Sequence, residues 1–131
     1  MAKAFSNKIN VAILLFSAST PFVMAQTPIF KDYSRAERTE IVILDNCVFV
    51  ESRPRGVVVV ANLRGVSLTD KSQYAPIVDL TCNSGNCIET KKRNSDGEYD
   101  FVSSGNYYRL AAFSDQSKSE KFFSVANQQC K

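Results

Sequence analysis

The stretch from residue 94 to residue 113 reads NSDGEYDFVSSGNYYRLAAF and carries the clearest fold signal in the chain. Its first four residues have the composition of a tight turn, because Asn and Asp bond their own backbone and Gly tolerates positive φ. Tyr99 and Phe101 follow two residues apart, so we expect them on one buried face of a strand. After a second turn at residues 103–106, the segment Tyr107–Phe113 is apolar enough for another strand. The stretch therefore indicates a small antiparallel β domain.

The rest of the chain repeats this pattern of short apolar runs between turn residues, with no amphipathic helix expected. The further expected strands are Ile41–Val50 with a bend or bulge at Asp45-Asn46, Val57–Ala61, a short edge strand near Val66–Leu68, Ala75–Cys82, Ile88–Lys92 and Lys121–Ala126. About seven or eight short strands are typical of an all-β sandwich or barrel. We predict a small, disulfide-stapled antiparallel β-sandwich over residues 41–131, preceded by a partly ordered lead-in over residues 26–40.

Residues 1–25 have the features of a secretory signal peptide. Lys3 and Lys8 supply the positive start, Val11–Phe16 opens a short apolar core, and small or compact residues precede a cleavage site after Ala25. That core is shorter than the roughly 20 residues of a membrane span. We therefore expect an exported protein, periplasmic or extracellular, with no membrane span after cleavage.

The charge balance argues against a nucleic-acid partner. The full chain has 16 basic and 13 acidic residues and a formal net charge of +3, and two of the basic residues, Lys3 and Lys8, lie in the predicted signal peptide. The remaining domain is close to neutral, whereas nucleic-acid binding requires a dense basic face.

The four cysteines all follow the predicted cleavage site. An even number in an exported domain implies two disulfides, for which three connectivities exist. Cys82 and Cys87 flank a loop suited to a hairpin, so we favour that pair, which leaves Cys47 to pair with Cys130. A zinc site is the competing interpretation, but the spacings contain no paired C-x2–4-C knuckles.

The composition leaves few routes to catalysis. The chain contains no histidine, which excludes Ser-His-Asp and Cys-His arrangements and His-based zinc sites. The cysteines are expected to be oxidised, and no Gly-rich phosphate loop is present, so we expect neither an enzyme nor a cofactor. Glu98 and Asp100 share a strand face and form the one candidate pair for a carboxylate-dependent hydrolase. A solvated strand face is the simpler explanation of that pair.

Two groups of residues are candidate binding surfaces. Lys91, Lys92 and Arg93 form a compact basic cluster in the sequence that could contact an acidic partner. If alternate residues of the strand 107–113 point inward, the outward ones combine two aromatic rings with an arginine, which is typical of interface hot spots. These outward residues are Tyr107, Arg109 and Phe113. The alternative is that a second layer packs over them.

The order of the apolar and turn motifs resembles that of transthyretin-like and carboxypeptidase-regulatory-like domains, a group that includes the Cna-B-type modules. The motifs that carry the resemblance are Val57–Val60, Arg64-Gly65, Ala75–Leu80, Asn94–Phe101 and Gly105–Leu110. The resemblance implies a non-catalytic sandwich used for folding support, adhesion or binding. The isopeptide-forming Lys and Asn of that group have no assigned counterpart in this chain.

The leading functional hypothesis is an exported, non-catalytic binding or accessory module that recognises a protein or a cell-surface component. The first alternative is a secreted or periplasmic inhibitor or immunity protein that blocks another protein's active site with a loop, either Asp70–Ala75 or Ser114–Glu120. The second alternative is the hydrolase that would use Glu98 and Asp100.

Overall fold

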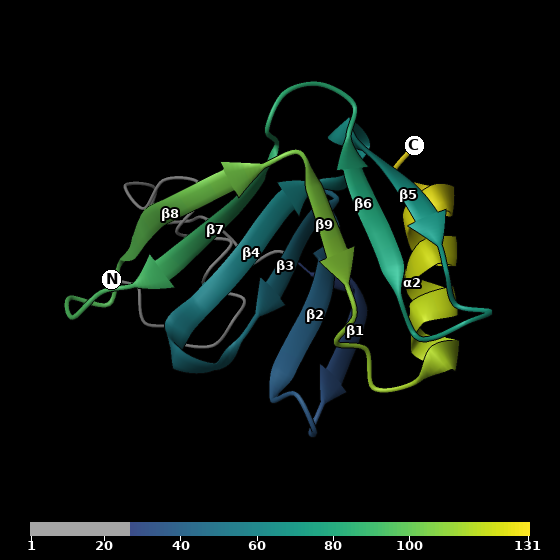
Figure 1. Cartoon of the computed structure of the whole chain (residues 1–131), viewed down its shortest axis with the longest axis horizontal. Coiled ribbons are helices and arrows are strands. Elements are labelled where there is room, and N and C mark those ends of the chain that lie inside the picture. Colours follow the sequence, from purple (N-terminus) through teal and green to yellow (C-terminus); the bar gives the residue numbers. More distant parts are fainter. Residues whose placement is uncertain (1–26) are drawn as a thin grey trace.

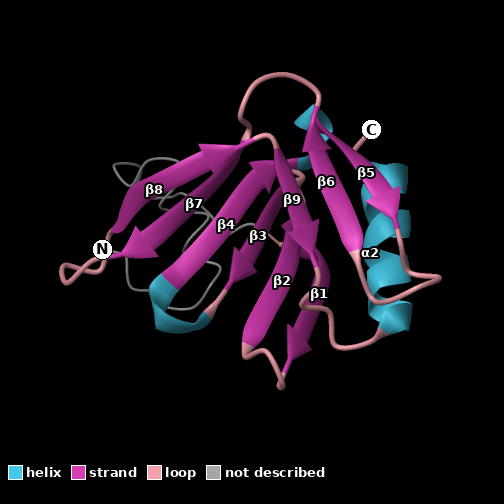
Figure 2. Cartoon of the chain, in the orientation of Figure 1, coloured by secondary structure: helices cyan, strands magenta, loops and turns pink. Residues whose placement is uncertain are grey.

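A computed structural model describes residues 27–131, so the predicted signal peptide lies outside the described residues. Figures 1 and 2 show this part of the chain as two antiparallel β-sheets and one long helix. The elements are β1 (Pro28–Ser34), β2 (Thr39–Leu44), β3 (Val48–Ser52), the 3-10 turn η2 (Pro54–Gly56), β4 (Val57–Asn62), the 3-10 turn η3 (Leu63–Gly65), β5 (Val66–Asp70), β6 (Val78–Cys82), β7 (Ile88–Arg93), β8 (Tyr99–Gly105), β9 (Tyr107–Leu110) and α2 (Gln116–Gln129).

The strands divide into a large and a small sheet. The large sheet has the order β1-β2-β3-β4-β7-β8, and the small sheet has the order β5-β6-β9. Every strand pair is antiparallel. The main core lies between the inner faces of the two sheets, and α2 closes it beside β5 and β1. The prediction of a small, disulfide-bonded, antiparallel all-β fold is therefore confirmed.

Phe122 of α2 lies at the centre of this core. Its ring centroid is 5.4 Å from that of Phe30 in β1, 5.8 Å from that of Phe49 in β3 and 5.3 Å from that of Phe113 in the segment before the helix. All three contacts are edge-to-face, the arrangement that aligns the positive edge of one ring with the negative face of another. One helix residue thus joins the helix to both the first and the third strand of the large sheet.

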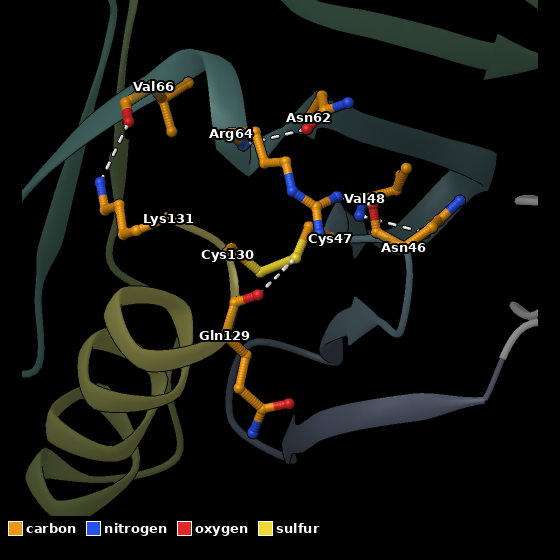
Figure 3. The surroundings of a disulfide bond; sticks show 9 residues. All are labelled: Asn46, Cys47, Val48, Asn62, Arg64, Val66, Gln129, Cys130 and Lys131. Atoms are coloured by element: carbon orange, nitrogen blue, oxygen red, sulfur yellow. Dashed lines mark hydrogen bonds between the residues drawn. A yellow bond between two sulfur atoms is a disulfide. The ribbon is translucent and has the colours of Figure 1, made fainter.

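Both predicted disulfides are confirmed. Cys82 pairs with Cys87, five residues away, and Cys47 pairs with Cys130 across a sequence separation of 83. The second bridge ties the β2–β3 turn to the residue that follows α2 (Figure 3). Around it, the Leu63 amide donates to the Cys47 carbonyl at 2.9 Å, and the Arg64 guanidinium donates to the Asn46 carbonyl at 3.2 Å. The turn therefore bonds to both the helix end and the η3 turn.

The expected last strand, Lys121–Ala126, was wrong, because this segment belongs to α2. Asp115 begins the helix by accepting a hydrogen bond from the Lys118 amide at 2.9 Å, which satisfies one of the free donors of the first turn. The buried residues Ser119, Phe122 and Ala126 recur at a spacing of three and four, the period of one helix face. The predicted loop Ser114–Glu120 was wrong for the same reason, since residues 116–120 form the start of this helix.

The N-terminal half contains two more strands than expected. Part of the expected lead-in, residues 26–40, forms β1 as a full edge strand of the large sheet. The expected single strand Ile41–Val50 is a hairpin, since the bend predicted at Asp45-Asn46 is a tight turn closed by the Cys47 amide and the Leu44 carbonyl at 2.8 Å. Cys47 completes this turn at a φ of +67°.

The two strands of the stretch 94–113 both form, but they belong to different sheets. β8 pairs with β7, whereas β9 pairs with β6. The predicted burial of Tyr99 and Phe101 was wrong, because Tyr99 is only half-buried and Phe101 is 60% exposed on the edge strand β8. The hairpin that carries them extends the large sheet beyond the core, where no second layer from the described residues covers them.

Candidate functional site: a cleft between β3 and β9

A cleft of about 430 Å³ opens where the end of β3 and the end of β9 face each other across the two sheets. Its walls come from the β1–β2 turn, the start of β2, the end of β3 with η2, and the last residues of β9 with the segment beyond it. The lining residues are Glu37, Thr39, Glu51, Arg53, Pro54, Tyr108, Arg109, Ala111 and Ala112. Strand alternation places Glu51 on the inner face of β3, because Phe49, two residues earlier, points into the core.

A buried carboxyl and a phenol form the floor of the cleft. Glu51 is 2% exposed, and the Tyr108 hydroxyl donates a short hydrogen bond to its Oε1. Burial raises the pKa of Glu51, an effect that the Tyr108 hydroxyl and the nearby Arg53 charge oppose without cancelling it. Burial, together with the neighbouring Glu51 charge, also raises the pKa of Tyr108. The pair therefore presents a protonated phenol and a carboxyl that takes up a proton more readily than a solvated one.

We expect Glu51 to make the protein less stable as the pH rises. Because its folded pKa lies above the ordinary value of 4.5, the folded state binds this proton more tightly than the unfolded state does. The free energy of unfolding should therefore fall as the pH rises from 4.5 through the raised folded pKa. In the variant Glu51→Gln, whose amide oxygen still accepts from Tyr108, this decline should disappear and the stability at neutral pH should increase.

Urea unfolding, monitored by circular dichroism at several pH values across this range, measures the free energy of unfolding of both proteins. Glu37→Gln, which removes an exposed carboxylate of the same cleft, is the matched control and should keep the wild-type decline. Asp79 does not interfere, since its pKa is lowered from 3.8 and its contribution to stability is lost only as the pH falls below that value. A Glu51→Gln variant with the wild-type pH dependence would contradict the assignment.

An ion pair borders the cleft on the outer face of the small sheet. Arg109 of β9 lies directly opposite Asp79 of β6, and its Nε and Nη2 donate to the two carboxylate oxygens at 2.8 and 2.9 Å. Asp79 is 7% exposed, and the guanidinium beside it lowers the pKa of that carboxyl. Tyr107, two residues before Arg109 on the same face, is 50% exposed. Beside the cleft, the outer face of β9 therefore combines an exposed aromatic ring with an arginine that an ion pair holds in place.

Of the three residues predicted to line the outer face of the strand 107–113, two lie where we expected them. Tyr107 and Arg109 point outward, but the placement of Phe113 was wrong, because it is 5% exposed in the core. β9 ends at Leu110, so strand alternation stops there and the chain turns toward α2. In this segment Phe113 packs edge-to-face on Phe30 and Phe122.

The predicted basic cluster does not form a single surface. Lys91, Lys92 and Arg93 are consecutive residues of β7, so alternate residues point to opposite faces of the large sheet. On one face, Lys91 Nζ lies 3.7 Å from Glu89 Oε1. On the other, Lys92 Nζ donates to the Arg55 carbonyl at 3.2 Å. None of the three lines the cleft.

The candidate hydrolase pair lies in the exposed β7–β8 hairpin, away from the cleft. Glu98 and Asp100 are both exposed, and Asp100 accepts two contacts from the Asn94 amide nitrogen at 3.2 and 3.3 Å. Within residues 27–131, no group of three or more Cys, Asp or Glu side chains has a geometry that could hold a metal ion. The described part of the chain also contains no helix that is long and apolar enough to cross a membrane.

Glu51 and Tyr108 were not among the site residues predicted from the sequence. The signal for Glu51 was present, since residues 47, 49 and 51 share one face of a strand whose first two members are apolar. A carboxylate that continues such a buried face needs a hydrogen-bonding partner. That partner, Tyr108, is 57 residues further along the chain, and no local pattern links the two.

Comparison with known proteins gave no match: no family model matches the chain, and neither curated proteins nor solved structures showed significant similarity to it. The resemblance to transthyretin-like and carboxypeptidase-regulatory-like domains is therefore not tested and stays a prediction.

Proposed function

We propose that the protein is an exported, non-catalytic binding module that recognises a protein or envelope component through the cleft between β3 and β9. The observation that carries the proposal is the cleft itself, a concave site of about 430 Å³ with a few convergent polar groups. The two disulfides support export, because such bonds persist in oxidising compartments.

The cleft is suited to a polar side chain or a chain terminus of a partner protein. Arg53 is exposed at its mouth and lies close enough to Tyr108 and Glu51 to affect both of their pKa values. A ligand carboxylate can bind this guanidinium at the mouth. Tyr107 and Arg109 add a preorganised contact surface, since the bond to Asp79 already fixes the arginine side chain.

Affinity capture with residues 26–131 as bait, from an envelope extract of the producing cell, tests the proposal. The amount of partner protein captured should fall at least about tenfold when the bait carries Arg53→Glu, and likewise when it carries Tyr107→Ala together with Arg109→Ala. Hot-spot residues of this kind dominate binding. Ser95→Ala, an exposed change at the tip of the β7–β8 hairpin, is the control and should capture it at the wild-type level. The purified bound protein should then form a complex of defined stoichiometry in calorimetry.

The inhibitor hypothesis has one observation of its own in its favour. Tyr74 is 80% exposed in the loop between β5 and β6, while Ser72 nearby is 1% exposed and its hydroxyl lies 2.7 Å from that of Ser119 on α2. The Gln116 side chain also donates a short hydrogen bond to the Ser72 carbonyl. A protruding ring on a loop anchored to the helix is suited to insertion into another protein's site. Loss of capture in Tyr74→Ala, with both cleft variants unaffected, would favour this function and contradict the proposed one.

A further inference from the structure

The outer face of the large sheet, opposite the core, is apolar across its three central strands. Six aliphatic side chains on β2, β3 and β4 form a second cluster, each 9% exposed or less: Val42, Leu44, Val48, Val50, Val58 and Val60. Among the described hydrophobic residues outside this cluster, Tyr99 is the one that packs against it, as a partly buried neighbour. The burial of this face therefore requires a layer that residues 27–131 do not supply.

The strand register places these residues in rows that run straight across the sheet. One row consists of Lys31, Val42, Val50, Val60 and Glu89. The next consists of Tyr33, Glu40, Ser52, Val58, Lys91 and Phe101. The aliphatic centre is thus bordered on both sides by one acidic and one basic residue. Beyond these charges, Tyr33 is 52% exposed and Phe101 is 60% exposed, one on each edge strand.

This face is large enough to bind a partner. Six strands at about 4.8 Å spacing span roughly 24 Å, and five residues at about 3.3 Å give roughly 17 Å along the strands, or on the order of 400 Å² in projection. The aliphatic residues occupy the part of this area that belongs to β2, β3 and β4, and charged and aromatic residues occupy the rest. Aromatic residues at both ends are typical of protein interfaces.

We propose that this face, which we call the valine face, binds the valine face of a second copy of the chain. A two-fold axis parallel to the strands, between β3 and β4, places β1 of one copy over β8 of the other and β2 over β7. The row that starts at Tyr33 then lies opposite the same row of the second copy, with the order of the strands reversed. Tyr33 meets the partner's Phe101, and Glu40 meets the partner's Lys91.

The charges of the valine face therefore complement each other in the dimer. Within one chain, Lys31 Nζ already lies 3.6 Å from Glu40 Oε2, and Lys91 Nζ lies 3.7 Å from Glu89 Oε1. In the dimer each of these pairs extends into a network of four charges. The aliphatic rows pack face to face between two such networks, which is the layer arrangement of a β-sandwich. The dimer surface lies on the opposite side of the large sheet from the cleft, so this proposal does not depend on the proposed function.

Sedimentation velocity of purified residues 26–131 over a wide range of concentrations tests the proposal. The expected result is a reversible dimer. Glu40→Lys and Lys91→Glu should each weaken it at least about tenfold, because each sets like charges opposite one another. The double variant Glu40→Lys/Lys91→Glu should restore the dimer, and Lys121→Glu on the exposed side of α2 should leave it unchanged. Circular dichroism of every variant confirms that the fold is intact.

Two results would overturn the proposal. The first is a monomer at every concentration, and the second is a dimer that the single charge changes do not weaken. If chain 26–131 is monomeric, and residues 1–25 of the full chain 1–131 protect the β2–β4 amides from hydrogen exchange, the valine face is assigned to the chain's own N-terminal segment.

Discussion

Replacing both Cys47 and Cys130 with alanine should lower the free energy of unfolding by about 4–5 kcal/mol. On the chain-entropy model, a cross-link removes freedom from the unfolded chain in proportion to the logarithm of the loop it closes. This bridge spans a sequence separation of 83 residues. A domain of this size is typically stable by only about 5–15 kcal/mol, so the variant should be close to its unfolding midpoint in water.

The second disulfide is the matched control for this prediction. Cys82 and Cys87 are only five residues apart, and the same model gives about 2 kcal/mol for so short a loop. Urea unfolding of the two double-alanine variants, followed by far-ultraviolet circular dichroism, compares them directly. An equal or larger loss for the Cys82/Cys87 variant would contradict the view that the longer bridge stabilises the fold by joining the β2–β3 turn to α2.

Replacing Phe122 with alanine should cost about 3–5 kcal/mol, the usual range for removing a large aromatic side chain from a packed core. Phe122 is fully buried and contacts three other rings, from β1, β3 and the segment before α2. The cavity left by the substitution would lie where the helix meets the large sheet, and those rings cannot fill it without shifting their strands.

Phe123→Ala is the control, since it makes the same chemical change in the same turn of the same helix. Phe123 is half-buried at the border of the core, so its loss should cost well under half as much. Chemical unfolding monitored by tyrosine fluorescence measures both variants. Equal costs would mean that α2 does not present the face that the structure shows.

The local features of the fold were predictable because they depend on neighbouring residues. Val57–Val60 forms a strand, since β-branched side chains fit a pleated surface better than a helix. The disulfide pairing followed from the loop between Cys82 and Cys87, whose two ends lie close together whatever the rest of the chain does.

The helix α2 was missed for a physical reason. Phe122, Phe123 and Val125 all have β propensity, and this favoured a strand over residues 121–126. The features that indicate a helix are the Asp115 cap and the spacing of the buried residues Ser119, Phe122 and Ala126. One of these buried residues, Ser119, is polar, which obscures the apolar face. That serine is tolerated because its hydroxyl meets Ser72 in the loop after β5, a contact that the sequence does not reveal.

The candidate site was predictable only in part. Tyr107 and Arg109 were found from strand alternation, but alternation fails at Phe113, where β9 has already ended. The Glu51–Tyr108 pair depends on how the two sheets pack, because its members come from different sheets and are far apart in the chain. Contacts of this kind follow from the tertiary fold and not from any local pattern.

A map of amide chemical shifts in isotope-labelled residues 26–131, recorded as the captured partner is added, tests the assignment of the cleft most directly. The largest changes are expected around the cleft, at the end of β3 and in β9, and Arg53→Glu should remove them. Changes confined to the loop around Tyr74, or to the outer face of β2–β4, would contradict the claim that the cleft is the recognition site.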